Sequence, residues 1–136
     1  MTKAIAEEGR SFGCACCLPA SVEEAWEARM NLVERAQLVD ESHFRVRILA
    51  CTNCSQKFLS IFTEVIDWFE GDVGQSWTTI PITMGEFGEL ASVAGSTISD
   101  ALRAIAPTRR SLRRHHPTGC APQTFWDCDI AVGPHD

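Results

Sequence analysis

The sequence predicts an α+β fold, in which an antiparallel sheet of about four strands packs against two to three helices and carries a four-cysteine knuckle. Stretches that alternate apolar and polar residues between positions 43 and 82 indicate consecutive strands. Two Ser/Thr-x-x-Glu patterns, at Ser21 and Thr83, are typical of helix starts. Two cysteine pairs, one before the first helix and one after the first strand, then connect the N-terminal arm to the sheet.

The chain is long enough for one domain with its own core. It has 136 residues, of which 45% are apolar, so we expect residues 1–136 to fold as a single unit. No apolar run is long enough to cross a membrane, and the N-terminus lacks the apolar stretch of a secretion signal, so a cytoplasmic protein is expected. The expected parts are a Cys-rich arm (1–20), a region of helix, hairpin and helices (21–106), a basic, Pro-containing loop (107–123) and a final strand (124–132).

The first helix is expected from Val22 to Val39. Ser21 and Glu24 form a capping-box pattern in front of it. Apolar residues then recur at roughly helical spacing, namely Val22, Ala25, Trp26, Met30, Val33 and Ala36. A helix with this pattern would bury one face and leave its charged residues outside.

Three strands are expected in the middle of the chain. Between His43 and Cys51, apolar residues occupy every second position. The segment 57–69 also fits helical spacing, but its β-branched and aromatic residues favour a strand. A Gly-rich turn then leads to a third strand, Trp77–Ile82, which completes a meander.

Two short helices are expected after this meander. Thr83 and Glu86 repeat the capping-box pattern before a helix that Gly95 should end. A second helix is expected from Ser96 to Ala106, where a proline stops it. Together with the first helix, they are expected to pack on one face of the sheet.

The spacing of the cysteines indicates a metal site. Cys14 and Cys17, and likewise Cys51 and Cys54, form C-x2-C pairs with 33 residues between the two pairs. Thiolates at this spacing can face one tetrahedral Zn2+ at about 2.3 Å, and two such turns supply four ligands. A closed shell of this kind leaves no position for a substrate, so the expected Zn2+ is structural.

The strand that runs into Cys51 and the C-x2-C turn that follows it resemble a zinc-ribbon knuckle at the level of the motif. The resemblance implies that the chain leaves Cys54 as the second arm of a hairpin. Cys16 is a doubtful ligand, because thiols on adjacent residues diverge. Cys120 and Cys128 lie outside the two pairs.

Other interpretations of the cysteines stay open. A thioredoxin-like redox motif would require a helix after Cys54, where the helix dipole lowers the pKa of a thiol. A second, mixed metal site could use His115, His116, Cys120 and Cys128, but their spacing is loose for zinc. Two solvated histidines in a basic loop and a core cysteine in the last strand, Cys128, explain these residues better, and a catalytic Cys120 has less support still.

Charge is distributed unevenly along a chain whose net charge is -6. Residues 1–102 carry 15 acidic and 7 basic side chains, whereas the Arg-rich segment (103–116) carries five arginines and no acid. On a helical turn these guanidinium groups would form a strip suited to phosphate or carboxylate. They exceed what a helix end requires. The expected partner-binding residues are Arg103, Arg109, Arg110, Arg113, Arg114, His115 and His116.

These features predict a small zinc-stabilised, non-catalytic binding or regulatory protein. A protein partner is expected, for example a basic toxin masked by an inhibitor of the immunity type, an interpretation that rests on size and charge alone. Nucleic-acid binding through the same arginines is the alternative, and a thiol redox enzyme comes third. The sequence contains no motif for acid–base or nucleophilic catalysis, and no membrane partner is expected.

Overall fold

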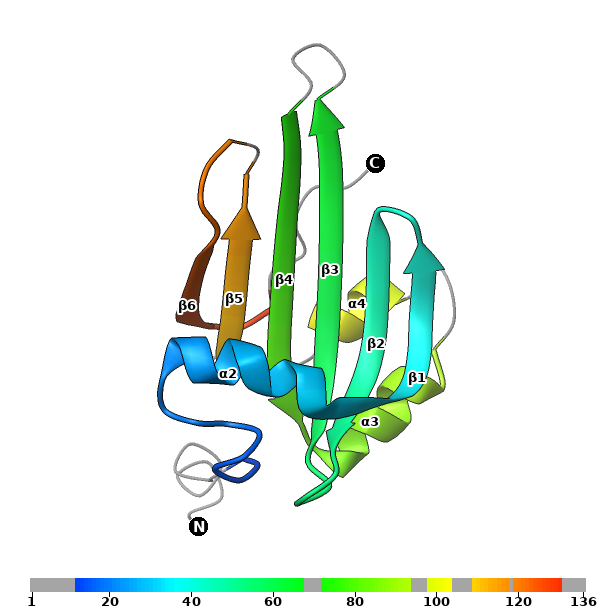
Figure 1. Ribbon diagram of the computed structural model, residues 1–136. Coiled ribbons are helices and arrows are strands. Elements are labelled where there is room, and N and C mark those ends of the chain that lie inside the picture. Colours follow the sequence, from blue (N-terminus) through cyan, green and yellow to red (C-terminus); the bar gives the residue numbers. More distant parts are fainter. Residues whose placement is uncertain (1–11, 68–71, 94–97, 104–108, 118, 131–136) are drawn as a thin grey trace.

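The computed structural model describes residues 12–67, 72–93, 98–103, 109–117 and 119–130. Their main element is a six-stranded antiparallel sheet whose strands follow one another in chain order (Figure 1). The strands are β1 (Leu32–Glu41), β2 (Phe44–Cys51), β3 (Lys57–Asp67), β4 (Asp72–Ile82), β5 (Arg110–His116) and β6 (Gln123–Cys128).

The predicted α+β fold with about four strands is wrong, because the described residues form mostly one six-stranded sheet with short helices. The helix expected over 22–39 ends early: α2 (Val22–Ala28) and a 3-10 turn, η1 (Arg29–Asn31), lead directly into β1. The loop expected at 107–123 contains β5. These additional strands flank the central meander of β2, β3 and β4, which the sequence predicted correctly.

Both missed strands lack a simple alternation of apolar and polar residues. The pairing of β1 with β2 is irregular between Glu34 and Ala36 and again between Gln37 and Val39. An extra residue at a bulge shifts the alternation, so the apolar residues of β1 repeat at intervals that resemble a helix. In β5, arginine or histidine occupies positions on both faces, which hides the period of two.

The main hydrophobic core lies on the side of the sheet covered by α3 (Met84–Ala91) and α4 (Ile98–Arg103), which we call the back face (Figure 1). α3 begins where predicted, since Thr83 and Glu86 form a complete capping box. The buried core residues alternate along the central strands and continue onto both helices: Phe44, Val46, Ile48, Leu59, Ile61, Ile80, Ile82, Leu90, Ile98 and Leu102.

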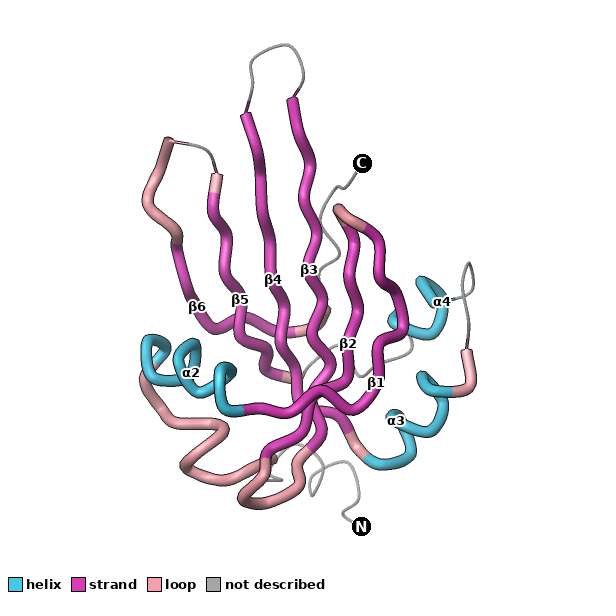
Figure 2. Tube along the Cα trace, turned by 45° about the vertical axis from the view of Figure 1, so that its right-hand side comes forward, coloured by secondary structure: helices cyan, strands magenta, loops and turns pink. Residues whose placement is uncertain are grey.

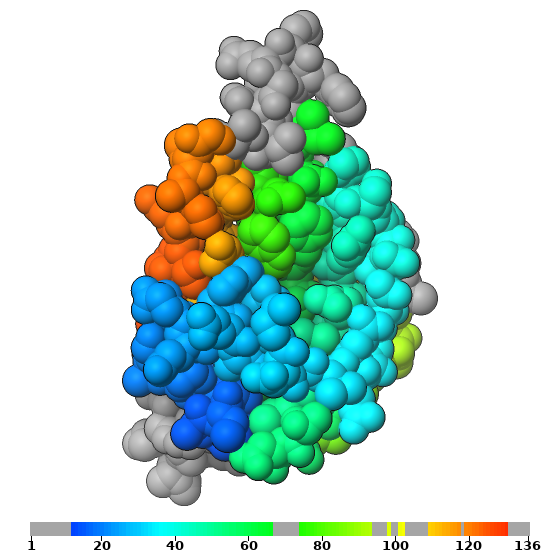
Figure 3. Space-filling view, viewed as in Figure 1, coloured from blue at the N-terminus to red at the C-terminus, as the bar shows by residue number. Residues whose placement is uncertain are grey.

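α2 crosses the opposite side of the sheet, which we call the front face (Figure 2), so the expectation that all helices pack on one face is wrong. It begins at Ser21, whose hydroxyl oxygen accepts a hydrogen bond from the backbone nitrogen of Glu24, as the sequence predicted. It packs on β5 and β6, and its Trp26 ring meets the Trp77 ring of β4 edge to face, with 5.6 Å between the centroids. α2 covers one end of this face, and β3 and β4 are open above it (Figure 3).

Candidate metal centre

The first cysteine pair lies on a tight turn before α2. The backbone nitrogens of Cys17 and Leu18 both donate to the carbonyl oxygen of Cys14, at 3.2 and 2.8 Å. Gly13 precedes this turn with a φ of +70°, a left-handed conformation that favours glycine. A Cβ atom at Gly13 would lie 2.6 Å from Cys17 Sγ, so the glycine also makes room for the sulfur.

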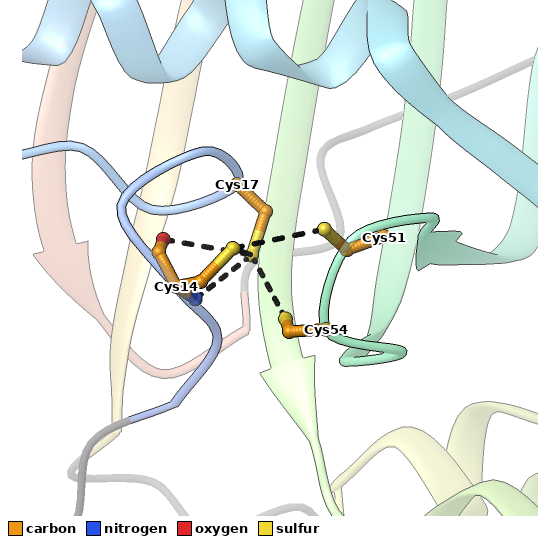
Figure 4. Close-up of side chains that lie close together, drawn as sticks. All are labelled: Cys14, Cys17, Cys51 and Cys54. Atoms are coloured by element: carbon orange, nitrogen blue, oxygen red, sulfur yellow. Dashed lines mark hydrogen bonds between the residues drawn. The ribbon is translucent and has the colours of Figure 1, made fainter.

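The second pair lies on the turn between β2 and β3. Cys51 ends β2, and its carbonyl oxygen accepts a hydrogen bond from the backbone nitrogen of Ser55 at 2.9 Å. The backbone nitrogen of Cys51 in turn donates to the carbonyl oxygen of Gln56, also at 2.9 Å. This closed hairpin turn presents Cys51 and Cys54 toward the first pair (Figure 4).

The four sulfur atoms of Cys14, Cys17, Cys51 and Cys54, here the four-cysteine cluster, converge on one point. The Sγ–Sγ distance is 3.9 Å from Cys14 to Cys17, 3.9 Å from Cys14 to Cys51 and 3.7 Å from Cys17 to Cys54. All four sulfurs lie within 4.8 Å of one another. A tetrahedral site with sulfur–metal distances of about 2.3 Å requires about 3.8 Å between sulfurs. The cluster therefore has the geometry to hold one metal ion.

Hydrogen-bond donors point at these sulfurs, and Asn53 supplies two of them. Its backbone nitrogen lies 3.3 Å from Cys51 Sγ, and its side-chain Nδ2 lies 3.4 Å from Cys14 Sγ. The hydrogen bond from the Asn53 side chain is the largest of the effects that lower the pKa of Cys14, to about 6. The lowered pKa favours the thiolate of Cys14, which is the form that binds a metal.

Burial raises the pKa of two other thiols of the cluster, one from each C-x2-C pair. It raises the pKa of Cys17 and that of Cys54, so without a metal both stay protonated at neutral pH. A bound cation favours the thiolates and displaces these protons. Metal affinity at this site should therefore fall as the pH falls.

Two residues that sequence reasoning missed position the cluster, Asn53 and Gln56. Gln56 Oε1 accepts a hydrogen bond from the backbone nitrogen of Gly13 at 2.9 Å. Its Nε2 donates to the carbonyl oxygens of Lys57 and Ile82, at 2.9 and 2.8 Å. The side chain thus ties the arm to the ends of β3 and β4. Position is the signal that points to both residues, since Asn53 lies inside the second C-x2-C turn and Gln56 just after it.

Arg109 of the Arg-rich segment is an internal structural residue. It is 9% exposed, and its guanidinium group donates to both carboxylate oxygens of Glu86, at 2.6 and 3.0 Å. It also donates to the carbonyl oxygen of Pro81 at 3.0 Å. Burial opposes the ionisation of Glu86, but the hydrogen bonds from Arg109 and Thr83 outweigh it and lower the pKa of Glu86. Arg109 therefore joins α3 to the end of β4.

β5 sends neighbouring side chains of the Arg-rich segment to opposite faces, so no helical strip forms. Arg113 donates to the carbonyl oxygen of Cys128 at 2.7 Å. Arg110 and Arg114 lie on the front face instead, with guanidinium carbons 4.1 Å from the Trp126 ring centroid and 4.4 Å from that of Trp26. Two arginines of the predicted set thus share a surface.

The other predicted partner-binding residues do not extend this pair into a strip. His115 is exposed, and its Nδ1 lies 3.0 Å from the hydroxyl oxygen of Ser76. His116 is half-buried at the end of β5. The backbone of Arg103 closes α4, and its side chain lies outside what the structure describes.

The cysteines outside the cluster are exposed, namely Cys16, Cys120 and Cys128, so the interpretation of Cys128 as a core cysteine is wrong. Cys16 Sγ lies 3.8 Å from Asn53 Nδ2 but is not among the four converging sulfurs. In the part of the chain that the structure describes, the four-cysteine cluster is the one gathering of three or more metal-binding side chains. The mixed histidine–cysteine site considered from the sequence is therefore not assembled there.

The described residues combine a six-stranded antiparallel sheet with a four-cysteine cluster that could hold a metal ion. Comparisons of the chain with protein-family models, with curated proteins and with solved structures find no significant match. Across the described ranges, none of the helices combines the length and the apolar character needed to cross a membrane.

Proposed function

We propose that this chain is a small, non-catalytic binding protein whose N-terminal arm is fastened to the sheet by a structural zinc ion. The observation that carries the proposal is the convergence of four sulfurs at distances suited to a tetrahedral metal. Four-thiolate tetrahedral sites suit zinc or iron. Paired C-x2-C turns are typical of structural zinc sites, so we propose zinc rather than iron.

A structural role is favoured because the protein supplies every ligand of a four-coordinate site. Catalytic zinc sites keep one position for water or substrate. A redox role would need a thiol at the start of a helix, but the second C-x2-C pair is followed by strand β3. The cluster therefore has neither an open coordination position nor a helix directly after its second C-x2-C pair.

The metal would act by fixing where α2 begins. The apolar cluster beneath the arm is small, with Cys17, Leu49, Cys51 and Phe58 as its buried members. A further tie is the hydrogen bond from Trp126 Nε1 to the carbonyl oxygen of Ala20, at 3.3 Å. Because α2 starts two residues after Ala20, a metal at the cluster would hold this helix in place across the front face.

The partner we propose is a protein with an acidic surface, bound at the front-face arginines Arg110 and Arg114. Both guanidinium groups lie over tryptophan rings, where their N–H groups can still donate to a carboxylate. Nucleic acid is the weaker candidate, because Arg109 and Arg113 are engaged in internal hydrogen bonds and the chain has a net charge of -6. Fewer cations are then available for phosphates.

Metal analysis by native mass spectrometry tests the zinc. We expect one Zn2+ per chain in the wild-type protein and in Cys120→Ser, which changes an exposed cysteine outside the cluster. Cys51→Ser should lose the ion, since three thiolates bind zinc far more weakly than four. Iron in the wild-type protein, or one zinc retained by Cys51→Ser, would contradict the assignment.

Binding to a mixed-sequence oligonucleotide tests the partner class. We expect no binding at about 200 mM salt, where phosphate contacts are strongly weakened. Tight binding that falls steeply between about 50 and 200 mM salt, and is lost in Arg110→Ala with Arg114→Ala, would instead establish nucleic acid as the partner.

A further inference from the structure

The front face carries a second feature, separate from the four-cysteine cluster. Side chains of β1 to β4 surround a pocket of about 360 Å³ on the part of this face that α2 leaves open (Figure 3). We call it the front pocket. Its lining includes two arginines, two acids, two aromatic residues and two glutamines: Arg45 and Arg47, Glu34 and Asp40, Phe62 and Trp77, and Gln37 and Gln75.

The two arginines in the front pocket are only loosely paired. Arg47 Nη1 lies 3.3 Å from a carboxylate oxygen of Glu34, and Arg45 Nε lies 4.0 Å from one of Asp40. The four side chains are between 38% and 65% exposed. Exposed ion pairs of this kind contribute little free energy. Both guanidinium groups are therefore free to reorient toward a bound anion.

Two more arginines add positive charge at the edge of the front pocket nearest α2. The guanidinium carbons of Arg29 and Arg114 lie 3.7 and 4.4 Å from the ring centroid of Trp26. Trp26 in turn contacts Trp77, which lines the pocket. Within the described residues neither arginine forms an ion pair. The edge is thus cationic within a chain of net charge -6.

Among the arginines in and beside the front pocket, Arg29 has a buried hydrogen-bond donor that is not used. Its Nε atom is buried and has no hydrogen-bond partner among the described residues. Burial, followed by the nearby charges of Arg47 and Arg114, lowers its pKa to about 10. A buried donor without a partner is costly, and like charges held together add to that cost. An anion placed between these groups would relieve both.

We propose that the front pocket binds a small anionic molecule with a flat unsaturated ring. Its carboxylate or phosphate would lie against Arg47 and Arg29, because guanidinium forks match the geometry of such oxyanions. Its ring would lie against Trp77 and Phe62, which offer aromatic surface for stacking. The volume falls in the range of small-ligand sites, about 300 to 1,000 Å³.

This inference goes beyond the proposed function, because it places a small-molecule site in a pocket that the acidic protein partner does not require. The amide of Gln37 would donate to or accept from polar atoms on the ring, and Gln75, whose Nε2 donates to Glu64 at 2.8 Å, would accept through its Oε1. They would fix the orientation of the ligand, while the arginines select its charge.

Isothermal titration calorimetry on the zinc-loaded full chain tests the proposal with two matched sets of probes. One set is adenosine 5′-monophosphate, adenosine and inorganic phosphate, and the other is indole-3-acetate, indole and acetate. We expect at least one ring-bearing anion to bind about tenfold more tightly than its uncharged ring and its simple anion. The proposal is overturned if neither binds at millimolar concentration, or if the uncharged rings bind as tightly.

Three variants with the same change in charge locate the site. Arg47→Met and Arg29→Met should each weaken binding about tenfold or more, whereas Arg35→Met, at an exposed position outside the pocket, should leave it within about twofold. Arg29→Met should not lower the melting temperature, since it removes a buried charge with an unmade hydrogen bond. Unchanged binding in Arg47→Met would overturn the proposal.

Metal content is measured in every sample. A chain that holds zinc but binds none of the six probes overturns the front pocket and leaves the zinc assignment standing. A chain without zinc that binds a ring-bearing anion, with loss in Arg47→Met, contradicts the zinc and supports the front pocket.

Discussion

The two faces of the sheet are made from the same strands but by different chemistry. On β2, Phe44, Val46 and Ile48 face the core on the back and are at most 7% exposed. Their neighbours Arg45 and Arg47 line the pocket on the front. The back face is closed by helices, whereas the front face holds the four-cysteine cluster and the front pocket. Apolar burial on one face leaves the other available for charged groups.

The hydrophobic cluster on the back face is also larger than the one under the N-terminal arm on the front face. The back-face core has ten buried members, while the cluster under the arm has four, two of which are Cys17 and Cys51. Burial of apolar area is the main source of folding free energy. The arm is therefore expected to depend on the proposed metal for its stability, whereas the back face should not.

The largest effect should come from a cavity in the back face. Ile48→Ala removes a fully buried side chain and should lower the free energy of unfolding by about 2 to 5 kcal/mol. Arg45→Ala, three residues away on the same strand and on the front face, should change the free energy of unfolding by about 0.5 kcal/mol or less. Urea denaturation measures both. Equal losses of unfolding free energy in the two variants would contradict the conclusion that the back face contributes most of the stability.

A substitution at Gly13 should break the metal site without touching a ligand. Both Gly13→Ala and Gly119→Ala place alanine at a positive φ, at a cost of about 1 to 2 kcal/mol each. Only at Gly13 does the new Cβ meet a sulfur, 2.6 Å from Cys17 Sγ, whereas nothing lies within 4 Å at Gly119. Zinc affinity, measured by competition with a chelator, should fall by about 100-fold or more in the first variant alone. Equal affinities would contradict the geometry of the arm.

Removal of the Asn53 side chain should have a smaller effect on the same site. Asn53→Ala deletes the donor to Cys14 Sγ and should lower zinc affinity by about 10- to 100-fold. Asn31→Ala, at an exposed position in η1, is the control and should not change it. The same chelator competition distinguishes the two variants. An unaltered zinc affinity in Asn53→Ala would show that the Asn53 side chain does not support the site.

The smallest effect concerns the Arg109–Glu86 pair and its response to pH. The pKa of Glu86 is lowered from its ordinary value of 4.5, so the stability it contributes is present above that value and is lost as the pH falls through the lower, folded value. Glu86→Gln should therefore be less stable at pH 7 by about 1 kcal/mol, with a difference that narrows below about pH 4.5. Glu89→Gln is an exposed control on α3. A difference that persists unchanged to pH 2 would contradict the ion pair.

Spacing along the chain predicts the four-cysteine cluster, because two short turns fix which thiols can face one ion. The central meander follows from alternation, and the starts of α2 and α3 follow from capping residues. These are local signals, readable within a few residues.

Features that depend on pairing between strands are harder to predict. The bulges that shift β1 exist only relative to β2. The front pocket likewise joins Arg47 of β2 to Trp77, two strands away. Arg29 fits the outer side of a longer helix in the sequence, yet it is half-buried against Trp26, because α2 ends at Ala28 and the chain turns into β1.

In the proposed arrangement a metal fastens the arm to the sheet, while the back face is stable without it. Hydrogen exchange followed by mass spectrometry, on the zinc-loaded and chelator-treated protein, distinguishes these two parts. We predict that removal of zinc exposes the amides of 12–20 and 51–56 to exchange while β3 and β4 keep their protection. Protection unchanged in both segments, or lost equally from β3 and β4, would contradict this arrangement.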